Sequence, residues 1–401
     1  MTRRIVLVAT HPIQYQVPWF RALAQQPGLE LVVLYASLPD DTAQGVGFDV
    51  PFSWDVPLFE GYPWRALANA YSSPRLDRFF GSRVRGLGSV LHELAPDAVV
   101  ITGWNQLPLL QALAACRARA IPAIVRGESN DQRARPWLAR TALRALLSRF
   151  QAFLTIGTAN RAFYLARGVP AGRIVDAPYA VDNERFARQA AELRADRDAV
   201  RGQLGIPPGA ACLAFVGKLI AKKRPLDLVE AAARCSLTRP LHLLIVGDGD
   251  LRQQVAARSR SLGMNATFTG FLNQSEIARA YVASDCLVLP SDEGETWGLV
   301  VNEAMACGVP AIVSDRVGCG VDLVLPGETG ERYPCADVAG LAAAIAAMAA
   351  EPADSARMGA RAQQRVVEQF SLARTVTGTL EAIEIACSPR AARTTGRWVT
   401  A

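Results

Sequence analysis

The feature that most constrains the fold of this chain is an alternation of short apolar runs with helix-type patterns. The first half contains such runs at residues 5–9, 30–35, 98–102, 121–125 and 152–156. A second series follows at residues 211–217, 242–247, 266–270, 285–290 and 310–314. Short continuous apolar runs are typical of strands that are buried on both faces of a parallel sheet. The sequence therefore predicts an α/β protein with two similar, Rossmann-like, doubly wound halves and a crevice between them.

Length and composition set the expected number of domains. The chain has 401 residues, of which 50 % are apolar and 20 % are charged, so two globular domains are expected. A charge-rich stretch at 182–210 ends in Gly-Ile-Pro-Pro-Gly and predicts a linker with a leading helix. The expected domains are 1–185 and 186–370, followed by a closing helix at 371–387 and a flexible tail at 388–401. A return of the closing helix to the first domain is one option.

The sequence gives no sign of a targeting or membrane-spanning segment. The apolar run at 5–9 is too short for the core of a signal peptide, and no apolar run approaches about 18 residues. The eight cysteines are scattered without a C-x-x-C pair, which favours small buried side chains in a reducing compartment over a disulfide framework. We therefore expect a cytoplasmic protein.

Positive charge is concentrated in the first half of the chain. Residues 1–185 hold 20 Arg, no Lys and 14 acidic residues, whereas the remainder is neutral. A helix pattern that begins near Pro136 is flanked or crossed by Arg135, Arg140, Arg144 and Arg149. A basic amphipathic helix fits an anionic membrane surface, and a solvated face above a core face is the alternative. An anionic partner is expected on this side, either a phosphate-bearing molecule or the inner face of a cell membrane.

The stretch 291–315 combines two carboxylates with a change from loop to helix. Glu295 follows a strand-type run, and Glu303 lies in a helix-type run that follows Gly298, at 299–306. We expect the first helical turn to contain the amides of Thr296, Trp297, Gly298 and Leu299. Such amides lack intrahelical partners, lie at the positive end of the helix dipole and suit a phosphate.

The spacing of these carboxylates excludes one function class. Eight helical residues span ~12 Å, whereas a glycosidase pair lies about 5–9.5 Å apart. Glu295 and Glu303 are better placed to bind hydroxyls at the two ends of an extended ligand. The alternative is that Glu295 caps a helix and Glu303 is solvated.

Other loops of the second half also follow strand-type runs. The segment 217–224 carries four cations, which fit a diphosphate, with a solvated basic turn as the alternative. Asp248 and Asp250 form a D-x-D, but the neighbouring glycines suit a tight turn, so we assign no metal. Asn273 and Glu276, in the loop after residue 270, have the spacing of a capping box.

Polar side chains follow two strands of the first half. His11, Gln14 and Tyr15 come after the first strand, and Arg126 and Glu128 come after the fourth. Ligands of open α/β sheets bind at the carboxyl ends of the strands, so these side chains are candidates for substrate contact. Scaffolding of the loops is the alternative.

Several motifs of the second half occur together: FVGKLIAKK at 215–223, IVGDG at 245–249, TGFL at 269–272 and PSDEGETWGLVVNEAMACGVP at 290–310. In combination they resemble the retaining glycosyltransferases of family 4, the group 1 type, which have the two-domain GT-B fold with a deep cleft between the domains. The resemblance is good from about residue 211 to 335 and looser through the first half.

The resemblance implies a site for a nucleotide-diphosphate sugar as co-substrate, with no cofactor and no metal. Its catalytic set would be Lys218 and Lys223, which neutralise the diphosphate, and Glu295, which binds the transferred sugar. The implied donor-binding residues are Gly217, Phe271, Leu272, Thr296, Trp297, Gly298, Leu299, Val300 and Glu303. Among these, the backbone near Phe271 would contact the base, and Glu303 the ribose. The implied acceptor side comprises His11, Gln14, Tyr15, Arg126 and Glu128.

Two departures from the family lie on the acceptor side. The loop after the first strand reads His-Pro-Ile-Gln at 11–14 where many members have glycines, and Arg126 stands near a position where many have histidine. The expected function is transfer of a hexose-type sugar, with retention, to the hydroxyl of a glycan, a lipid-linked glycan or another acceptor in bacterial polysaccharide or glycoconjugate assembly. The alternatives are a nucleotide-sugar epimerase of the same fold and a non-catalytic nucleotide-sugar-binding or membrane-associated module. A nucleic-acid partner is not expected.

Overall fold

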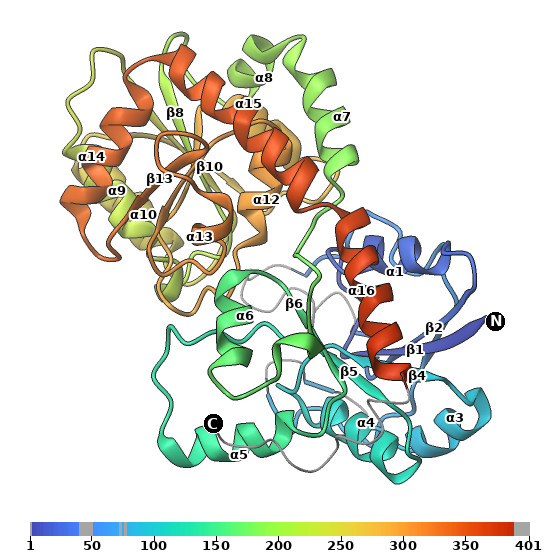
Figure 1. Ribbon diagram of the computed structural model, residues 1–401. Coiled ribbons are helices and arrows are strands. Elements are labelled where there is room, and N and C mark those ends of the chain that lie inside the picture. Colours follow the sequence, from blue (N-terminus) through green and yellow to red (C-terminus); the bar gives the residue numbers. More distant parts are fainter. Residues whose placement is uncertain (1, 40–50, 72–73, 76–77, 389–401) are drawn as a thin grey trace. The chain divides into compact units, whose positions relative to one another are not determined.

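The computed structural model describes residues 2–39, 51–71, 74–75 and 78–388. By their contacts, the described residues within 1–43, 57–179 and 372–401 form unit 1, and those within 44–56 and 180–371 form unit 2. Each unit is a parallel sheet covered by helices (Figure 1), which confirms the expected class of two Rossmann-like domains. The expected tail lies, from residue 389 onward, outside the described residues.

In the described residues, unit 1 has a seven-stranded parallel sheet in the order β3-β2-β1-β4-β5-β6-β7. Its strands are β1 (Arg3–Ala9), β2 (Leu29–Tyr35), β3 (Trp64–Ala66), β4 (Ala98–Ile101), β5 (Ala123–Arg126), β6 (Ala152–Thr155) and β7 (Ile174–Asp176). The central strand β1 pairs with β2 on one side and with β4 on the other. Its continuous apolar run is buried on both faces, because helices cover both sides of the sheet.

The helices of unit 1 are α1 (Val17–Ala24), α3 (Leu87–Leu94), α4 (Leu107–Ala118), α5 (Trp137–Leu147), α6 (Thr158–Leu165) and α16 (Leu372–Cys387). Helix α16 packs on α1 and on strands β4 to β7 (Figure 1). The indole of Trp19 donates to Thr379 Oγ1 at 3.1 Å, and Thr375 Oγ1 donates to Pro178 O at 2.7 Å. A Cβ at Gly378 would lie 2.1 Å from Asp176 O, so a glycine is needed for this close approach of α16 to β7. The last described helix is therefore an integral part of unit 1.

Unit 2 has a six-stranded parallel sheet in its described residues, in the order β10-β9-β8-β11-β12-β13. Its strands are β8 (Ala211–Val216), β9 (Leu241–Val246), β10 (Asn265–Gly270), β11 (Cys286–Leu289), β12 (Ala311–Ser314) and β13 (Gly330–Tyr333). The chain runs outward from β8 to β10 and then returns to place β11 beside β8. The β8–β11 junction is therefore the point where the strand order reverses, and ligands of such sheets bind there.

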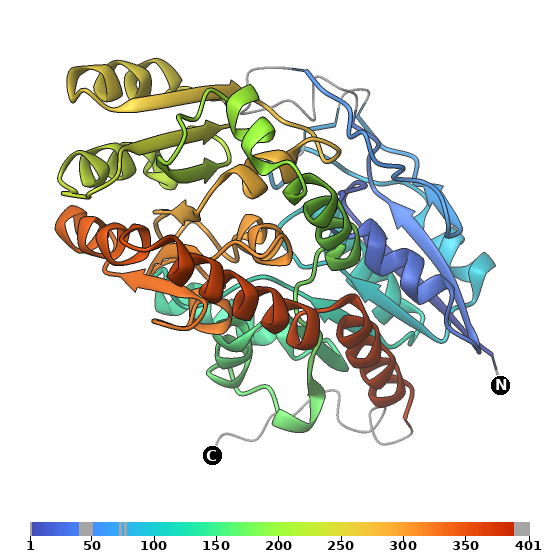
Figure 2. The same cartoon turned by 90° about the horizontal axis from the view of Figure 1, so that it is seen from above.

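The helices of unit 2 are α7 (Asn183–Arg194), α8 (Arg197–Gln203), α9 (Pro225–Ala233), α10 (Arg252–Ser261), α11 (Ile277–Ala283), α12 (Leu299–Ala306), α13 (Gly320–Leu323), α14 (Val338–Ala349) and α15 (Pro352–Gln369). Helices α14 and α15, orange and red in Figure 2, pack on the edge strand β13. The stretch expected as a linker forms α7 and α8, which pack on α11 and, for α7, also on α12. The division between the units falls at 179/180, whereas the sequence predicted it at 185/186.

A buried ionic cluster attaches α8 to the sheet of unit 2. Asp285, just before β11, accepts from Arg197 at 2.8 Å and from Arg239 at 2.5 Å. Arg201, 6 % exposed, lies 3.9 Å from the same carboxylate and donates to the carbonyls of Ala283 and Ala210. The carboxylate also accepts from the amide of Cys212 in β8 at 2.8 Å. Its removal would leave the positive charges of three arginines uncompensated in a largely buried place.

Candidate nucleotide-sugar site

The loops after β8 and β11 meet at the reversal point of the unit 2 sheet. Lys223 comes from the first loop and Glu295 from the second, and the two side chains form an ion pair. Both are largely buried, with 13 % and 14 % of the side chain exposed, and Ser291 Oγ lies 3.4 Å from the same Glu295 oxygen. The structure therefore joins two residues that lie 72 positions apart in the sequence.

Lys218 adds a second cation to this edge of the sheet. Its pKa is lowered, first by burial and then by repulsion from Lys222 and Lys223. Lys222 is exposed and donates to Gly294 O at 3.4 Å, which links the β8 loop to the β11 loop a second time. An anionic ligand would stabilise the protonated form of Lys218, because its charge would offset both the burial and the repulsion that lower the pKa.

Glycines allow the loops after β8, β9 and β10 to approach one another closely. Gly217, Gly247 and Gly270 all have positive φ, at 144°, 122° and 72°. Gly247 N donates to Gly270 O at 2.8 Å, and a Cβ at Gly247 would lie only 2.0 Å from Gly217 O. A side chain at Gly247 would push the ends of the strands apart. Steric exclusion of a Cβ therefore explains why the motif has glycine at this position.

The β11 loop is held by the loop after β12. Gly318 N donates to Glu295 O at 3.0 Å, and Cys319 N donates to Trp297 O at 2.9 Å. A Cβ at Gly318 would lie 1.8 Å from Thr296 O. The position of Glu295 therefore depends on a contact between two loops, and this contact tolerates only glycine at residue 318.

Helix α12 matches the helix-type run predicted at 299–306, but only part of the expected set of amides lies in its first turn. Its first residue is Leu299, and Gly298 is the N-cap with φ 101°. The amides of Leu299 and Val300 lie in the first turn, whereas Thr296 and Trp297 precede the helix, because the left-handed conformation of Gly298 interrupts it. The side chain of Trp297 is 3 % exposed and donates to Asn302 Oδ1 at 2.8 Å, so it packs in the core.

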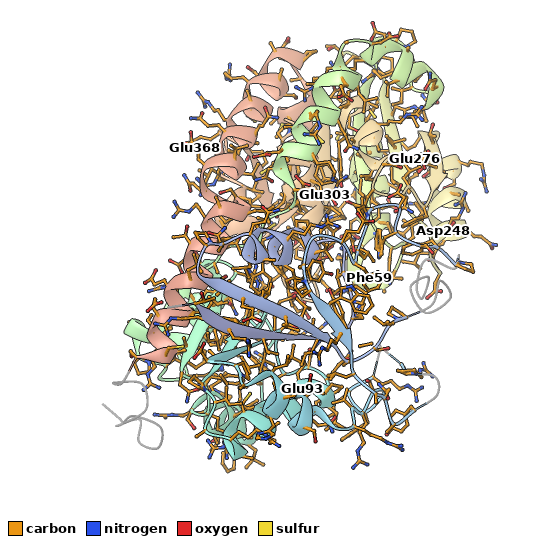
Figure 3. The ribbon with its side chains drawn as sticks, turned by 90° about the vertical axis from the view of Figure 1, so that its right-hand side faces the viewer. Phe59, Glu93, Asp248, Glu276, Glu303 and Glu368 are labelled. Carbon is orange, nitrogen blue, oxygen red and sulfur yellow. The ribbon has the colours of Figure 1, made fainter. Side chains whose placement is uncertain are left out.

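Glu303 is buried and hydrogen-bonded. It is 1 % exposed, and it accepts from Tyr281 Oη at 2.6 Å and from Gln274 Nε2 at 3.3 Å. The alternative of a solvated surface glutamate is therefore wrong. Figure 3 shows Glu303 among the packed side chains of unit 2, whereas Glu368 lies at the outer margin. Each carboxylate oxygen can accept more than one hydrogen bond, so a ligand hydroxyl could join those already present.

The partners of Glu303 could not be predicted from the motifs. Gln274 is 5 % exposed and lies in the loop after β10, close in sequence to Phe271 and Leu272. Arg185 of α7 donates to the backbone carbonyl and to the side-chain oxygen of Gln274, at 2.8 and 2.7 Å. The only available signal was the position of Gln274 after a strand, and this signal did not distinguish it from neighbouring loop residues.

The candidate acceptor residues all lie in unit 1. His11 Nδ1 is 3.0 Å from Thr10 Oγ1, and burial lowers the pKa of His11 to about 4, so the ring is neutral at neutral pH. Gln14 is 8 % exposed, and its Oε1 has no hydrogen-bond partner within the described part of the chain. Tyr15 is partly buried.

Arg126 and Glu128 are linked through Tyr179. The guanidinium of Arg126 lies 5.0 Å from the centroid of the Tyr179 ring and 4.5 Å from that of Trp19. The Tyr179 hydroxyl donates to Glu128. Burial, followed by the charge of Glu128, raises the pKa of Tyr179 well above its ordinary value, and burial lowers the pKa of Arg126. The structure therefore groups three of these side chains at the carboxyl ends of β5 and β7.

Among the described residues, no group of three or more His, Cys, Asp or Glu side chains is arranged to hold a metal ion. Asp248 of the D-x-D instead accepts from Arg252 at 2.7 Å and from Gly249 N at 2.9 Å. The cysteines are free thiols. In the same described part of the chain, every helix is too short or too polar to cross a membrane.

The fold and the loops around Lys223 and Glu295 agree with two family models. Residues 196–365 match the model of the glycosyl transferases group 1, and residues 12–180 match that of the glycosyl transferase 4-like domain. The two models together match most of the chain, which therefore belongs to the group 1 glycosyltransferases, the family 4 type of GT-B protein.

Curated relatives match over part of their length. The chain is 38 % identical over 196 residues to the D-inositol 3-phosphate glycosyltransferase of Rhodococcus erythropolis, covering 46 % of this chain and 44 % of the relative. It is 34 % identical over 176 residues to the glycogen synthase of Mycobacterium tuberculosis, covering 43 % and 42 %. The chain thus spans less than half the length of these relatives.

Solved structures share the fold over nearly the whole chain. A glycosyltransferase from Rickettsia africae has a TM-score of 0.72 and 15 % identity, covering 96 % of this chain and 98 % of that one. HepE from Anabaena, solved in complex with UDP and glucose, has a TM-score of 0.69 and 16 % identity, covering 94 % and 98 %. At these identities the likeness shows the fold alone.

Proposed function

We propose that this protein is a retaining glycosyltransferase that moves a hexose-type sugar from a nucleotide-diphosphate sugar to an acceptor hydroxyl. The observation that carries the proposal is the Lys223–Glu295 pair at the β8–β11 reversal point, beside Lys218. Cations for a diphosphate and a carboxylate for sugar hydroxyls meet where ligands of this type of sheet bind.

The roles follow from the positions of the side chains. Lys218 and Lys223, with the first-turn amides of α12, would bind the diphosphate and stabilise negative charge as it leaves. Glu295 would accept hydrogen bonds from hydroxyls of the transferred sugar. Glu303 would accept them from the ribose. The ligand would break the Lys223–Glu295 ion pair, because Lys223 would turn to the diphosphate and Glu295 to the sugar. Binding of the diphosphate would thereby free Glu295 for the sugar hydroxyls.

The reaction would exchange one bond at the anomeric carbon for another. The bond from this carbon to the diphosphate oxygen breaks, and its electron pair leaves with the phosphate. The acceptor oxygen forms the new bond on the same face, and the leaving phosphate takes the acceptor proton. In this scheme the lysines and amides offset the developing charge, so we assign no metal and no second carboxylate base.

Helix α5 supports an acceptor at an anionic membrane surface. Trp137 and Leu138 at its start are 72 % and 63 % exposed. The helix carries Arg140 and Arg144 and has no acidic residue. Exposed apolar side chains beside cations fit the boundary of an anionic bilayer. A lipid-linked or membrane-proximal acceptor in polysaccharide or glycoconjugate assembly is therefore part of the proposal.

The first test is a screen of nucleotide sugars for thermal stabilisation, since a ligand that binds only the folded state raises the unfolding midpoint. A positive donor is then incubated with candidate acceptors, and released nucleoside diphosphate and the anomeric configuration of the product are measured. Transfer with retention supports the proposal. A sugar product formed without any acceptor would indicate an epimerase, and binding without turnover would indicate a non-catalytic module.

A further inference from the structure

A segment from the first half of the sequence belongs to unit 2. The described residues 51–56 are assigned to unit 2 by their contacts, whereas the chain from residue 57 onward belongs to unit 1. We call residues 51–56 the strap. The strap packs on residues 271–275, which follow β10 and are called the β10 loop below.

Side chains of the β10 loop hold the strap by hydrogen bonds. Asn273 Nδ2 donates to Ser53 O at 2.7 Å, and Asn273 Oδ1 accepts from Asp55 N at 3.4 Å. The Asp55 carboxylate accepts from Ser275 N at 3.0 Å and from the Ser275 hydroxyl. The capping box expected at Asn273 is not formed, because α11 has Glu276 at its N-cap without a side-chain cap bond.

Three aromatic rings meet at the same place. Phe52 stacks on Phe271 with ring centroids 4.2 Å apart and planes at 28°. Trp54 lies edge-on to both, 4.8 Å from Phe52 and 6.1 Å from Phe271. All three side chains are only partly buried, so each keeps some surface exposed to solvent. Because Phe271 follows β10, these rings lie at the edge of the sheet that also carries Lys223 and Glu295.

The β10 loop is also joined to Glu303. Gln274 donates to Glu303 Oε1 at 3.3 Å, and Arg185 holds Gln274 in place through both of its carbonyl oxygens. A nucleoside has its base attached directly to the ribose. A ligand whose ribose hydroxyls reach Glu303 therefore brings its base within reach of the β10 loop and of the rings packed on it.

We propose that the strap completes the nucleotide site and that Phe52, Trp54 and Phe271 form the surface against which the nucleobase stacks. The inference rests on the proposed function, because it takes the ligand to be a nucleoside diphosphate or its sugar ester. Every nucleobase has a π face, so stacking on aromatic side chains binds it without requiring a particular hydrogen-bond pattern.

The hydrogen bonds of the strap explain how the rings are positioned. Phe52 and Trp54 lie in a segment without regular secondary structure, so their order depends on Asp55 and Asn273. A surface that is ordered before the ligand arrives loses less conformational entropy on binding. The alternative is a purely structural role, in which the rings only shield one another and the β10 loop from water.

The experiment compares the affinity for a ligand that has a nucleobase with the affinity for a ligand that lacks one. Calorimetry on the full chain measures Kd for the tightest-binding nucleoside diphosphate among UDP, GDP and ADP, and for inorganic pyrophosphate. The variants are Phe52→Ala and Trp54→Ala, with Trp54→Phe as the conservative substitution. Phe59→Ala is the matched control, because Phe59 is a nearby aromatic residue in unit 1 that packs on Tyr35 and Trp64 instead.

We expect both alanine variants to raise Kd for the nucleoside diphosphate about 10-fold, within the range of about 5- to 150-fold for loss of one stacking contact. Pyrophosphate affinity should stay within about twofold, and Trp54→Phe and Phe59→Ala should behave like the parent. Variants Asp55→Ala and Ser275→Ala should each weaken binding of the nucleoside diphosphate. The double variant should resemble Asp55→Ala, because the Asp55 carboxylate accepts the hydroxyl bond that Ser275→Ala removes as well as the bond from Ser275 N.

Two results would overturn the inference. One is an unchanged nucleoside diphosphate Kd in the alanine variants, and the other is an equal loss for pyrophosphate, which would indicate a structural role alone. If the parent protein binds no nucleoside diphosphate at all, the proposed function itself fails, and the inference fails with it. If the parent binds the nucleoside diphosphate and the Phe52→Ala and Trp54→Ala variants bind it equally well, the inference is wrong and the proposed function still stands.

Discussion

Lys218 is the residue of the site whose charge state should respond to a ligand. Burial and the charges of Lys222 and Lys223 lower its pKa below the ordinary 10.5. A bound diphosphate favours the protonated form, so affinity should fall as pH rises through the lowered pKa of free Lys218. Calorimetry with a nucleoside diphosphate from roughly pH 7 to 10 checks this. Lys218→Arg keeps its proton and should flatten the profile; an unaltered slope would contradict the assignment.

His11 should make unit 1 sensitive to acid. Its pKa falls from 6.5 in the unfolded chain to about 4 in the folded protein, because burial disfavours the imidazolium. Between these values the unfolded state binds more protons, so stability rises with pH and is lost as pH falls from 6.5 toward 4. We expect this loss to be at most about 3 kcal/mol and to shrink in His11→Gln. Urea unfolding near the two ends of this window measures it, and equal losses in parent and variant would refute it.

The residues of the candidate donor site could be predicted because each lies in a short motif next to a strand. Lys218, Lys223, Glu295 and Glu303 are all in such motifs. Their partners could not be predicted. The bonds from Tyr281 and Gln274 to Glu303 join elements that are distant in the sequence, so they depend on tertiary packing.

Among the elements, the β11 loop depends most on one glycine. A Cβ at Gly318 would lie 1.8 Å from Thr296 O, so Gly318→Ala must displace the loop that carries Glu295. We expect a loss of about 2–4 kcal/mol of unfolding free energy, with weaker donor binding. Gly202→Ala in α8 is the matched control, since a Cβ there meets nothing within 4 Å, and it should be neutral or slightly stabilising. Denaturant unfolding measures the stability of both variants. A Gly318→Ala variant as stable as Gly202→Ala would contradict the close contact between the loops.

Helix α5 gives a second prediction at this scale. Trp137 and Leu138 are exposed beside arginines, so the protein should sediment with vesicles that contain anionic lipid and not with neutral ones. Binding should weaken as salt is added, because surface charge attraction is screened. Replacing both residues by Ser should reduce binding about 10-fold or more, while Phe80→Ser, another exposed aromatic of unit 1, should not. Equal binding to neutral vesicles would contradict the membrane proposal.

Strands that coincide with continuous apolar runs could be predicted, and three edge strands with charged residues could not. The expected strand runs match β1, β2, β4, β5, β6 and β8 to β12 to within about two residues. Strands β3, β7 and β13 were missed. They are three or four residues long, lie at sheet edges and contain charged residues, so parallel pairing with the neighbouring strand defines them rather than local sequence. Helix α12 has the bounds predicted from its sequence, 299–306. The amides of Thr296 and Trp297 were wrongly placed in its first turn, because the left-handed conformation of Gly298 cannot be read from the hydrophobic pattern.

At the scale of the whole chain, the repeated strand order explains why two sets of loops carry the candidate residues. Each sheet reverses its strand order once, beside β1 in unit 1 and beside β8 in unit 2. His11 follows β1, and Lys218 and Lys223 follow β8. The sequence could predict this doubling from its two series of apolar runs. It could not predict that residues 51–56 leave unit 1, because nothing in the strap itself shows which unit it packs on.

The central claim is that Glu295, paired with Lys223, holds the donor sugar during transfer. The most direct measurement is the rate of nucleoside diphosphate release by the parent, by Glu295→Gln and by Glu293→Gln, which changes a carboxylate two residues away in the same loop. We expect Glu295→Gln to lower the rate about 100-fold or more, because hydrogen bonds to a charged group are lost, while the protein remains folded. Glu293→Gln should keep the parent rate. A folded Glu295→Gln variant that also keeps the parent rate would contradict the claim.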